Sequence, residues 1–297
     1  MSRRMSRPVL AAVLSLAALV SACSPADDDE TASDTTSATT SPSTSSDACA
    51  TDALQTQTDG KLTIGTDKPA YEPWFVDDDP ANGKGYESAV AYAVAEELGY
   101  AKTDVTWVPV KFDAAIQPGP KNFDFDINQF SITEERQQVV DFSSPYYDVT
   151  QTVITTGESK AATATTIADL KGRKLGAQVG TTSLAAINEV IAPSSDAAVF
   201  NSNDDAKIAL ENGQIDALVV DLPTAFFITA AELDNGKIVG QLPPSTGDQE
   251  QFGLLLDKDS PLTDCVSMAV DALRSDGTLD ELQQQWLAQA AGAPVLK

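Results

Sequence analysis

The sequence has 297 residues, with 19 Lys and Arg, 44 Asp and Glu and no His, so its formal net charge is −25. This balance excludes a nucleic-acid binder that follows phosphates with a basic face, and the lack of His excludes Ser-His-Asp triads, Cys-His dyads, HExxH zinc sites and His general bases. With 42% hydrophobic residues the chain can still bury a core, and its length suggests about two domains or lobes.

The first segment has the pattern of a targeting signal. Three Arg in the first seven residues precede an apolar run at 9–20 that is too short to span a bilayer. Val20-Ser21-Ala22-Cys23 then resembles the lipobox of bacterial lipoproteins, whose Cys is diacylated and becomes the new N-terminus; an ordinary secretory signal is the alternative. We therefore expect residues 1–22 to be removed, Cys23 to carry lipid, and a mature charge of 16 − 44 = −28 outside the cytoplasm.

Residues 23–47 have the composition of a disordered tether. They are mostly Ser, Thr, Ala and Asp, with almost no large apolar side chain to offset chain entropy. The acidic run Asp27-Asp28-Asp29-Glu30 has an alternative interpretation as a metal site, but a solvated spacer fits its surroundings better. Such a tether lets a domain sit roughly 25–30 Å from its anchor.

Cys49 and Cys265 remain once Cys23 carries lipid. Two cysteines in an oxidising compartment predict a disulfide, and the alternative is one buried and one exposed thiol. The bridge would stabilise the fold by at most about 5 kcal/mol through chain entropy. It would also tie the start of the domain to its last helices.

The rest of the chain alternates between strand and helix patterns. Strands are expected around residues 62–67, 105–110, 123–127, 175–178 and 217–220, and helices around 86–98 and from about 183, 203, 223 and 278. Thr278 to Glu281 have the spacing of a capping box for the last helix. This alternation of strands and helices predicts an α/β fold with parallel sheets and helices on both faces.

Polar side chains follow the predicted strands. Asp67, the run Asn128 to Arg136, the run Gln178 to Thr182, and Asp221 all occupy such positions. Ligands bind at the carboxyl ends of parallel strands, and between the lobes of a two-lobed protein. One Arg, one distant Asp and several hydroxyls suit a free amino acid, because Arg can bind the carboxylate and Asp the ammonium.

Several motifs resemble one family. Ser131-Ile132-Thr133-Glu134-Glu135-Arg136, followed by Val140-Asp141-Phe142-Ser143-Ser144-Pro145-Tyr146-Tyr147, resembles the family 3 extracellular solute-binding proteins, the polar amino-acid receptors of ABC importers. Asp169-Leu170-Lys171-Gly172, Gly180-Thr181-Thr182, Gly213-Gln214-Ile215-Asp216-Ala217, Asp221, Asp276-Gly277-Thr278 and Trp286 follow in the family's order. The resemblance covers about residues 61–290.

The resemblance implies a role for each matching residue. Arg136 would take the ligand's α-carboxylate, with Ser131 and Thr182 completing that subsite beside Thr181. Asp221 would receive the α-ammonium. The alternatives are a surface or cap Arg for Arg136 and a helix-capping Asp for Asp221, and one Asp could serve both purposes.

Two aromatic residues and an acid are the expected walls of the pocket. Tyr71 and Phe112 match the two aromatic residues that sandwich the ligand, with ordinary core packing as the alternative. Asp67 matches an acid that meets a polar or basic ligand side chain, with a plain turn residue as the alternative. The chain departs from the family at three amides, which are expected to narrow the pocket or bind the ligand side chain: Asn128, Gln129 and Gln178.

Family geometry implies a two-lobed periplasmic-binding-protein-like fold of type II, in which each lobe is a mostly parallel sheet flanked by helices. The chain would cross between the lobes twice, near residues 146–150 and 245–249. Lobe 1 would then comprise residues 48–145 and 250–297, and lobe 2 residues 151–244.

The resemblance implies an extracytoplasmic receptor, lipid-anchored to the outer face of the cell membrane. It would act as a monomer, capture a polar or cationic amino acid of the glutamine, arginine, glutamate or histidine class, and deliver it to ABC permease subunits. No catalytic residue, metal, cofactor or nucleic acid is expected. The alternatives are an enzyme similar to cyclohexadienyl dehydratases, which share the architecture, and a ligand-sensing receptor.

Overall fold

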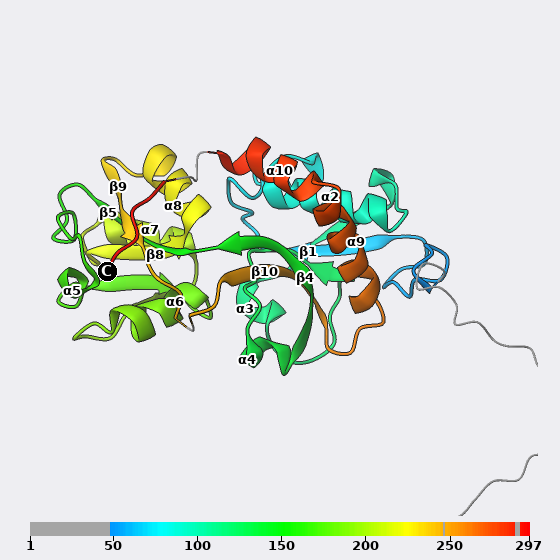
Figure 1. The fold of residues 1–297 in the computed structure, drawn as a ribbon, viewed down its shortest axis with the longest axis horizontal. Coiled ribbons are helices and arrows are strands. Elements are labelled where there is room, and N and C mark those ends of the chain that lie inside the picture. The colour runs from blue at the N-terminus through cyan, green and yellow to red at the C-terminus, as the bar shows by residue number, and fades with distance from the viewer. Residues whose placement is uncertain (1–47, 246, 289–291) are drawn as a thin grey trace, which may run out of the picture. The chain divides into compact units, whose positions relative to one another are not determined.

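Two five-stranded sheets organise the computed structural model, which describes residues 48–245, 247–288 and 292–297. The strand orders are β2-β1-β3-β10-β4 and β7-β6-β8-β5-β9. Each sheet with its helices is called a lobe here, lobe 1 for the first and lobe 2 for the second (Figure 1). The predictions for the signal peptide, Cys23 and the 23–47 tether lie outside the described residues.

Lobe 1 contains both early and late segments of the chain. Its strands are β1 (Leu62–Thr66), β2 (Val105–Pro109), β3 (Phe125–Asp126), β4 (Val140–Val149) and β10 (Glu250–Asp257). Its helices are α2 (Tyr86–Glu97), α3 (Phe112–Ala115), α4 (Glu134–Gln137), α9 (Thr263–Ser275) and α10 (Thr278–Leu287), with short 3₁₀ turns at Pro80–Asn82 and Lys102–Asp104. The expected strand at 123–127 is therefore shorter than predicted.

Lobe 2 is built from the middle of the chain. Its strands are β5 (Gln151–Thr156), β6 (Leu175–Gln178), β7 (Ala198–Phe200), β8 (Ala217–Asp221) and β9 (Gly236–Gln241). Its helices are α5 (Ile167–Leu170), α6 (Thr182–Ala186), α7 (Asn203–Glu211) and α8 (Leu222–Phe227). Two π-helical turns, at Ile187–Ile191 and Ile228–Glu232, continue α6 and α8.

Helices cover both faces of each sheet because side chains of a strand alternate between the faces. On β10, Phe252, Leu254 and Leu256 pack under α2, α9 and α10, while Leu255 packs on the opposite face with Phe112 of α3. Figure 1 shows these helices on opposite sides of the lobe 1 sheet. The buried strands of lobe 2 alternate in the same way between two clusters.

Each sheet is mixed, with a single strand running against the other four, which fits the expectation of mostly parallel sheets. β1 pairs in parallel with β2 and β3, but β10 runs antiparallel to β3 and β4. In lobe 2, β6 is parallel to β7 and β8, whereas β5 is antiparallel to β8 and β9. The cause is the crossing of the chain between lobes, because a strand that returns from the other lobe enters its sheet in the opposite direction.

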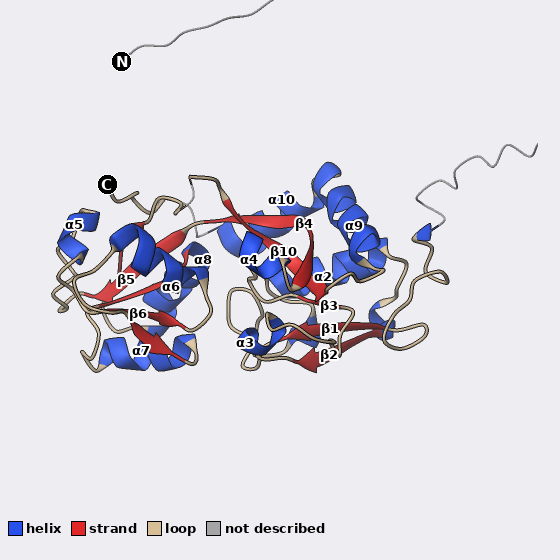
Figure 2. Cartoon of the chain, turned by 90° about the horizontal axis from the view of Figure 1, so that it is seen from below, coloured by secondary structure: helices blue, strands red, loops and turns tan. Residues whose placement is uncertain are grey.

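Two crossings lie close to where they were expected. Val149 of β4 pairs with Glu250 in lobe 1, and Gln151 of β5 pairs with Asp221 in lobe 2, so Thr150 alone separates the two sheets. The return runs through residues 242–249, between β9 and β10. Figure 2 shows β4 and β10 side by side as they approach this junction.

The C-terminal tail makes a third crossing that was not expected. Val295 forms a parallel bridge with Gln241 of β9, and Leu296 is buried among the apolar side chains of lobe 2. The Ile167 N–H donates to the Lys297 carbonyl. Residues 292–297 therefore pack on lobe 2, and their assignment to lobe 1 is wrong.

The Cys49–Cys265 disulfide is confirmed. The two Cα atoms lie 5.4 Å apart across a sequence separation of 216 residues. Cys265 lies in α9, so the bridge ties the first described residues of lobe 1 to its late helices.

The predicted capping box at Thr278 is wrong. Gly277, in the left-handed conformation with φ 89°, occupies the N-cap of α10 instead, and Thr278 is already helical. Glycine adopts this backbone conformation without the steric cost that a Cβ brings, so the turn itself sets where the helix starts.

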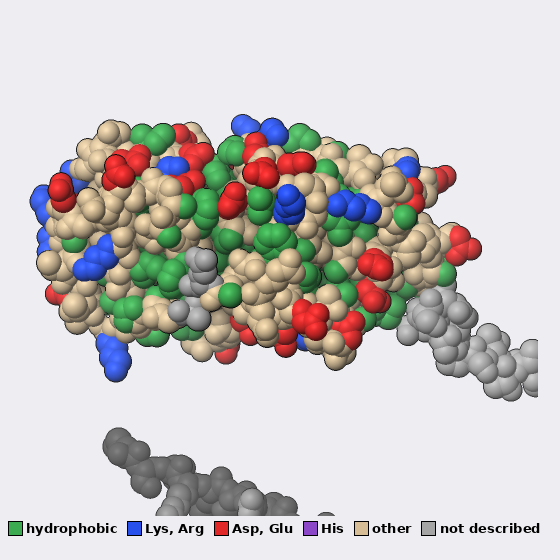
Figure 3. All heavy atoms as spheres, turned by 90° about the horizontal axis from the view of Figure 1, so that it is seen from above, with side chains coloured by type: hydrophobic (Ala, Val, Ile, Leu, Met, Phe, Trp, Pro, Cys, Tyr) green, Lys and Arg blue, Asp and Glu red, His purple; other side chains and the backbone are tan. Residues whose placement is uncertain are grey.

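The surface matches the acidic composition. In Figure 3, acidic side chains are spread over the visible face of the described residues, with basic ones among them. No helix within the described ranges is long and apolar enough to cross a membrane.

Candidate functional site

A small cavity lies where the two lobes meet. It is lined by lobe 1 and lobe 2 residues alike: Asp67, Tyr71, Phe112, Asn128, Gln129, Arg136, Gln178, Thr181, Thr182, Ser183, Asn203, Val220 and Asp221. Ten of these residues are the ones that sequence reasoning selected, and Ser183, Asn203 and Val220 were missed. Ser131, also selected, lies beside the cavity and contacts Thr182.

The Arg136 guanidinium is buried at the lobe junction. Its Nη1 donates to the Ser131 carbonyl at 2.6 Å, and its Nη2 donates to the Gly180 carbonyl of lobe 2 at 2.9 Å. Burial lowers the pKa of Arg136 to about 10, while the negative charges of Glu250 and Asp221 oppose that shift. At neutral pH the group is still a cation with N–H donors suited to a carboxylate.

Three hydroxyls surround this guanidinium, and they have different roles. Ser131 Oγ and Thr182 Oγ1 lie 3.0 Å apart across the lobes. Thr181 Oγ1 instead accepts from the Leu184 N–H at 3.2 Å and donates to the Gln178 carbonyl at 2.7 Å, which caps α6. Thr181 therefore has a structural contact that occupies its hydroxyl proton.

Asp221 stands at the N-cap position of α8 but makes no capping hydrogen bond with its side chain. Its carboxylate instead accepts from Gln151 Nε2 at 3.0 Å. Burial, and then the charge of Glu250, raises the pKa of Asp221 to about 8. The carboxyl thus faces the cavity without a cationic partner in an ion pair among the described residues, an arrangement that suits a cationic ligand group.

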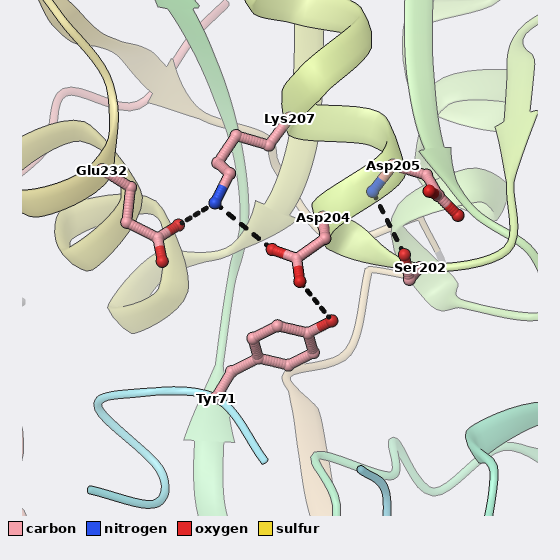
Figure 4. A network of polar contacts seen from close by, with 6 residues as sticks. All are labelled: Tyr71, Ser202, Asp204, Asp205, Lys207 and Glu232. Atoms are coloured by element: carbon pink, nitrogen blue, oxygen red, sulfur yellow. Dashed lines mark hydrogen bonds and ion pairs between the residues drawn. The ribbon is translucent and has the colours of Figure 1, made fainter. Parts of the chain in front are cut away.

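Tyr71 closes one side of the cavity by reaching across to α7. Its hydroxyl donates to Asp204 Oδ2 at 3.2 Å, and Asp204 pairs with Lys207, which also pairs with Glu232 (Figure 4). Burial, followed by the negative charge of Asp204, raises the pKa of Tyr71. The aromatic ring therefore lines the cavity while its hydroxyl joins the lobes.

Phe112 belongs both to the core and to the cavity. Its ring stacks on Phe130 at a centroid distance of 4.8 Å within the apolar cluster of lobe 1. The Arg136 guanidinium carbon lies 5.6 Å from the same ring, within the range of a cation–π contact. The two alternatives for this residue are therefore compatible.

Asp67 lies at the end of β1, where its carboxylate accepts from two backbone N–H groups. The donors are Lys68 at 2.7 Å and Phe112 at 3.3 Å. Burial raises the pKa of Asp67, and these backbone hydrogen bonds lower it. Asp67 therefore has the structural role of a turn residue, and it also lines the cavity.

The three amide residues, Asn128, Gln129 and Gln178, have different surroundings. Asn128 and Gln178 are buried residues of the cavity wall. Gln129 has a left-handed backbone, with φ 49°, and both its backbone N–H and its side-chain amide donate to Glu87. Burial raises the pKa of Glu87 to about 7 against these hydrogen bonds. The Gln129 side chain is therefore bound inside lobe 1.

Two polar residues at the crossings were missed by sequence reasoning. Gln151 follows the first crossing and Glu250 follows the second, and both line a cleft of about 1,100 Å³ that shares Arg136, Thr181 and Thr182 with the small cavity. The local sequence has no motif that marks either one. The only sequence feature that could have identified them is their position, because each comes immediately after an expected crossing.

The lobes are in contact across the cavity. Besides the Tyr71 contact, Trp74 Nε1 of lobe 1 donates to Thr224 Oγ1 of lobe 2 at 2.8 Å. The cavity has a volume of about 30 Å³, which is room for little more than one water molecule. A ligand the size of an amino acid therefore requires the lobes to separate. Among the described residues, no cluster of His, Cys, Asp or Glu is arranged to hold a metal ion.

Comparison with known proteins decides the family. Residues 62–289 match the bacterial extracellular solute-binding proteins, family 3. The chain belongs to this family. The earlier resemblance is therefore confirmed, and the two crossings of the family fold explain why strand ends from distant segments meet at one cavity.

Individual relatives agree with this assignment. The chain is 29% identical to the L-arginine-binding protein of Pseudomonas aeruginosa, over 76% of this chain and 90% of that protein. It is 28% identical to the L-cystine-binding protein of Escherichia coli, over 80% and 85% of the two chains. The solved structure of an ancestral amino acid-binding protein, a precursor of cyclohexadienyl dehydratase, is similar with a TM-score of 0.63, at 31% identity over 76% of this chain and 95% of that chain.

Proposed function

We propose that this protein is the substrate-binding receptor of an ABC importer and captures a free amino acid between its two lobes. The observation that carries the proposal is the placement of one cation and one acid on opposite lobes: Arg136 and Asp221 line the same cavity. An α-amino acid has a carboxylate for the first and an ammonium for the second. Relatives named for arginine and cystine binding support this ligand class.

The side chain of the ligand would lie toward Asp67 and Tyr71. Asp67 is a partly buried acid whose pKa is raised by burial, so a cationic or hydrogen-bond-donating side chain would be favoured beside it. The buried amides Asn128 and Gln178 add polar contacts. We therefore propose a polar or cationic amino acid, with arginine and glutamine as the first candidates.

Capture would close the lobes around the ligand and present the closed form to the permease. Ligand contacts made only in the closed state shift the population toward it, because a ligand that binds both states equally shifts nothing. Thr150 and the segment between β9 and β10 are links on which the lobes would move, and the C-terminal tail that packs on lobe 2 is a third connection.

We also propose that Cys23 anchors the mature protein by lipid to the outer face of the cell membrane, because the lipobox pattern precedes it directly. A Cys23→Ser variant would then be released from the membrane fraction. The mass of the mature wild-type N-terminus would show the acyl chains directly, and an unmodified Cys23 would exclude the anchor.

A calorimetric screen of the twenty amino acids tests the function. We expect stoichiometric binding of a polar or cationic amino acid and a smaller radius of gyration by small-angle scattering in its presence. Binding of none of the twenty would reject the proposal. Formation of a product from a cyclohexadienyl acid would identify an enzyme instead, the direction taken by descendants of the ancestral protein named above.

A further inference from the structure

Glu250 brings a carboxylate of this chain into the carboxylate end of the cavity. It is the first residue of β10, where the chain returns to lobe 1. Its Oε1 accepts from Ser131 Oγ and from Thr182 Oγ1, both at 2.6 Å. These are the two hydroxyls that the family pattern assigns to the ligand's carboxylate.

A single amide joins Glu250 to Asp221. Gln151 Nε2 donates to the Glu250 carboxylate at 3.1 and 3.2 Å and to Asp221 Oδ1 at 3.0 Å. The orientation of this amide is set because Gln151 Oε1 accepts from Ser183 Oγ at 2.6 Å. Two acids from opposite lobes therefore share one neutral donor group, and neither forms an ion pair with a Lys or Arg among the described residues.

The hydroxyl protons are limited in number. Ser131 and Thr182 have one proton each, and with both directed at Glu250 neither remains for a ligand carboxylate. In that arrangement recognition of the carboxylate falls on Arg136, whose guanidinium donates two hydrogen bonds among the described residues, to the Ser131 and Gly180 carbonyls.

We propose that Glu250 is a positioning residue of the ligand site, which orients the Ser131 and Thr182 hydroxyls and controls the ionisation of Asp221 across the lobe junction. This inference rests on the proposed function, because it assigns the ligand's ammonium to Asp221. In this proposal, the incoming ammonium gives Asp221 the cationic partner that no ion pair among the described residues provides.

The surroundings of Asp221 set the direction of the effect. The charged or titratable groups that face it are Glu250, Glu87, Arg136, Tyr146 and Tyr147. Burial, and then the charge of Glu250, together raise its pKa to about 8. Binding of an ammonium favours the ionised carboxylate, so ligand binding near neutral pH releases a proton and affinity rises with pH until Asp221 is ionised.

Glu250→Gln tests the proposal against Asp248→Asn, a matched control that removes one negative charge from an exposed position in the same linker. Binding is measured by calorimetry from pH 5.5 to 9, in buffers of different ionisation enthalpy. We expect Glu250→Gln to move the midpoint of the affinity profile down by roughly one pH unit and to reduce proton release at pH 7. Asp248→Asn should leave both unchanged.

A ligand-free measurement separates failure of this inference from failure of the proposed function. A folded pKa of about 8 for Asp221, above its unfolded value of about 3.9, makes stability fall as pH rises from about 4 to 8. The fall in melting temperature over this window should be smaller for Glu250→Gln, and for Glu250→Ala if the Gln variant does not fold, than for Asp248→Asn. Equal profiles in all variants would overturn the inference, whereas absence of amino-acid binding by wild type would reject the function alone.

Discussion

The C-terminal tail provides the sharpest test of the fold because it joins the lobes a third time. Leu287 of α10 is buried in lobe 1, and Leu296 is buried in lobe 2. The tail is also hydrogen-bonded to β9: the Gln241 N–H donates to the Pro294 carbonyl at 2.7 Å, and the Leu296 N–H donates to the Gln241 carbonyl at 2.8 Å. The perturbation is Leu296→Ala, with Val295→Ala as its control.

The magnitude follows from burial. Leu296 is 3% exposed and Val295 is 58% exposed. Truncation of a buried Leu to Ala costs about 2–5 kcal/mol, whereas a change at an exposed position usually stays within about 0.5 kcal/mol. We therefore expect Leu296→Ala to lower the free energy of unfolding of lobe 2 by about 3 kcal/mol and Val295→Ala to have almost no effect.

Two measurements are needed. Urea unfolding is monitored by a spectroscopic probe in lobe 2, and small-angle scattering is recorded separately on the folded, ligand-free protein. Scattering is informative because Gln241 also connects the tail to the first crossing: its side chain accepts from Thr150 Oγ1 and donates to the Ala293 carbonyl, both at 2.6 Å. Removal of residues 292–297 should thus increase the radius of gyration. Equal unfolding midpoints for the two Ala variants would refute the packing of the tail on lobe 2.

Three further predictions concern the site and the disulfide. Arg136→Ala should weaken every amino-acid ligand at least about thirtyfold by calorimetry, because it leaves the ligand's carboxylate without its cation; unchanged affinity would move the carboxylate elsewhere. Asp67→Asn should lower the preference for arginine over its neutral isostere citrulline by about tenfold while both still bind, and an unchanged ratio would remove Asp67 from the side-chain subsite. The Cys49→Ser, Cys265→Ser double variant should lose up to about 5 kcal/mol of unfolding free energy relative to wild type, and an unchanged melting temperature would contradict the entropic account.

Local patterns predicted the parts of the fold that depend on local physics. The helix at Tyr86–Glu97 and the strands at Leu175–Gln178 and Ala217–Asp221 lie within one residue of where periodicity placed them. Polar residues after strands met at one cavity because the carboxyl ends of neighbouring strands share an edge of a sheet. The start of α10 was wrong because Thr278 has the sequence of a cap, but Gly277 has the backbone conformation that the turn requires.

Long-range features had no local signal. Glu250 and Gln151 are 99 positions apart, and they meet because β10 pairs with β4 at the crossings, where Glu250 lies opposite Val149. Residues 292–297 are too few to show a strand or helix periodicity, so neither their strand-like bridge nor their lobe was predictable from the sequence. Both misses concern the relation between lobes, which depends on how the chain returns through its crossings.

The polar character of the lobe junction accounts for how a small ligand can control it. The direct contacts across it include Tyr71 with Asp204, Trp74 with Thr224 and Arg136 with Gly180. Each such hydrogen bond contributes only about 1 kcal/mol net, and closure buries the Asp221 carboxyl beside Glu250, which disfavours its ionised form. Reversal of a two-state population from 1:99 to 99:1 takes about 5.5 kcal/mol. An ammonium that neutralises the two acids and a carboxylate that binds Arg136 can supply that difference, because both contacts form fully only when the lobes meet.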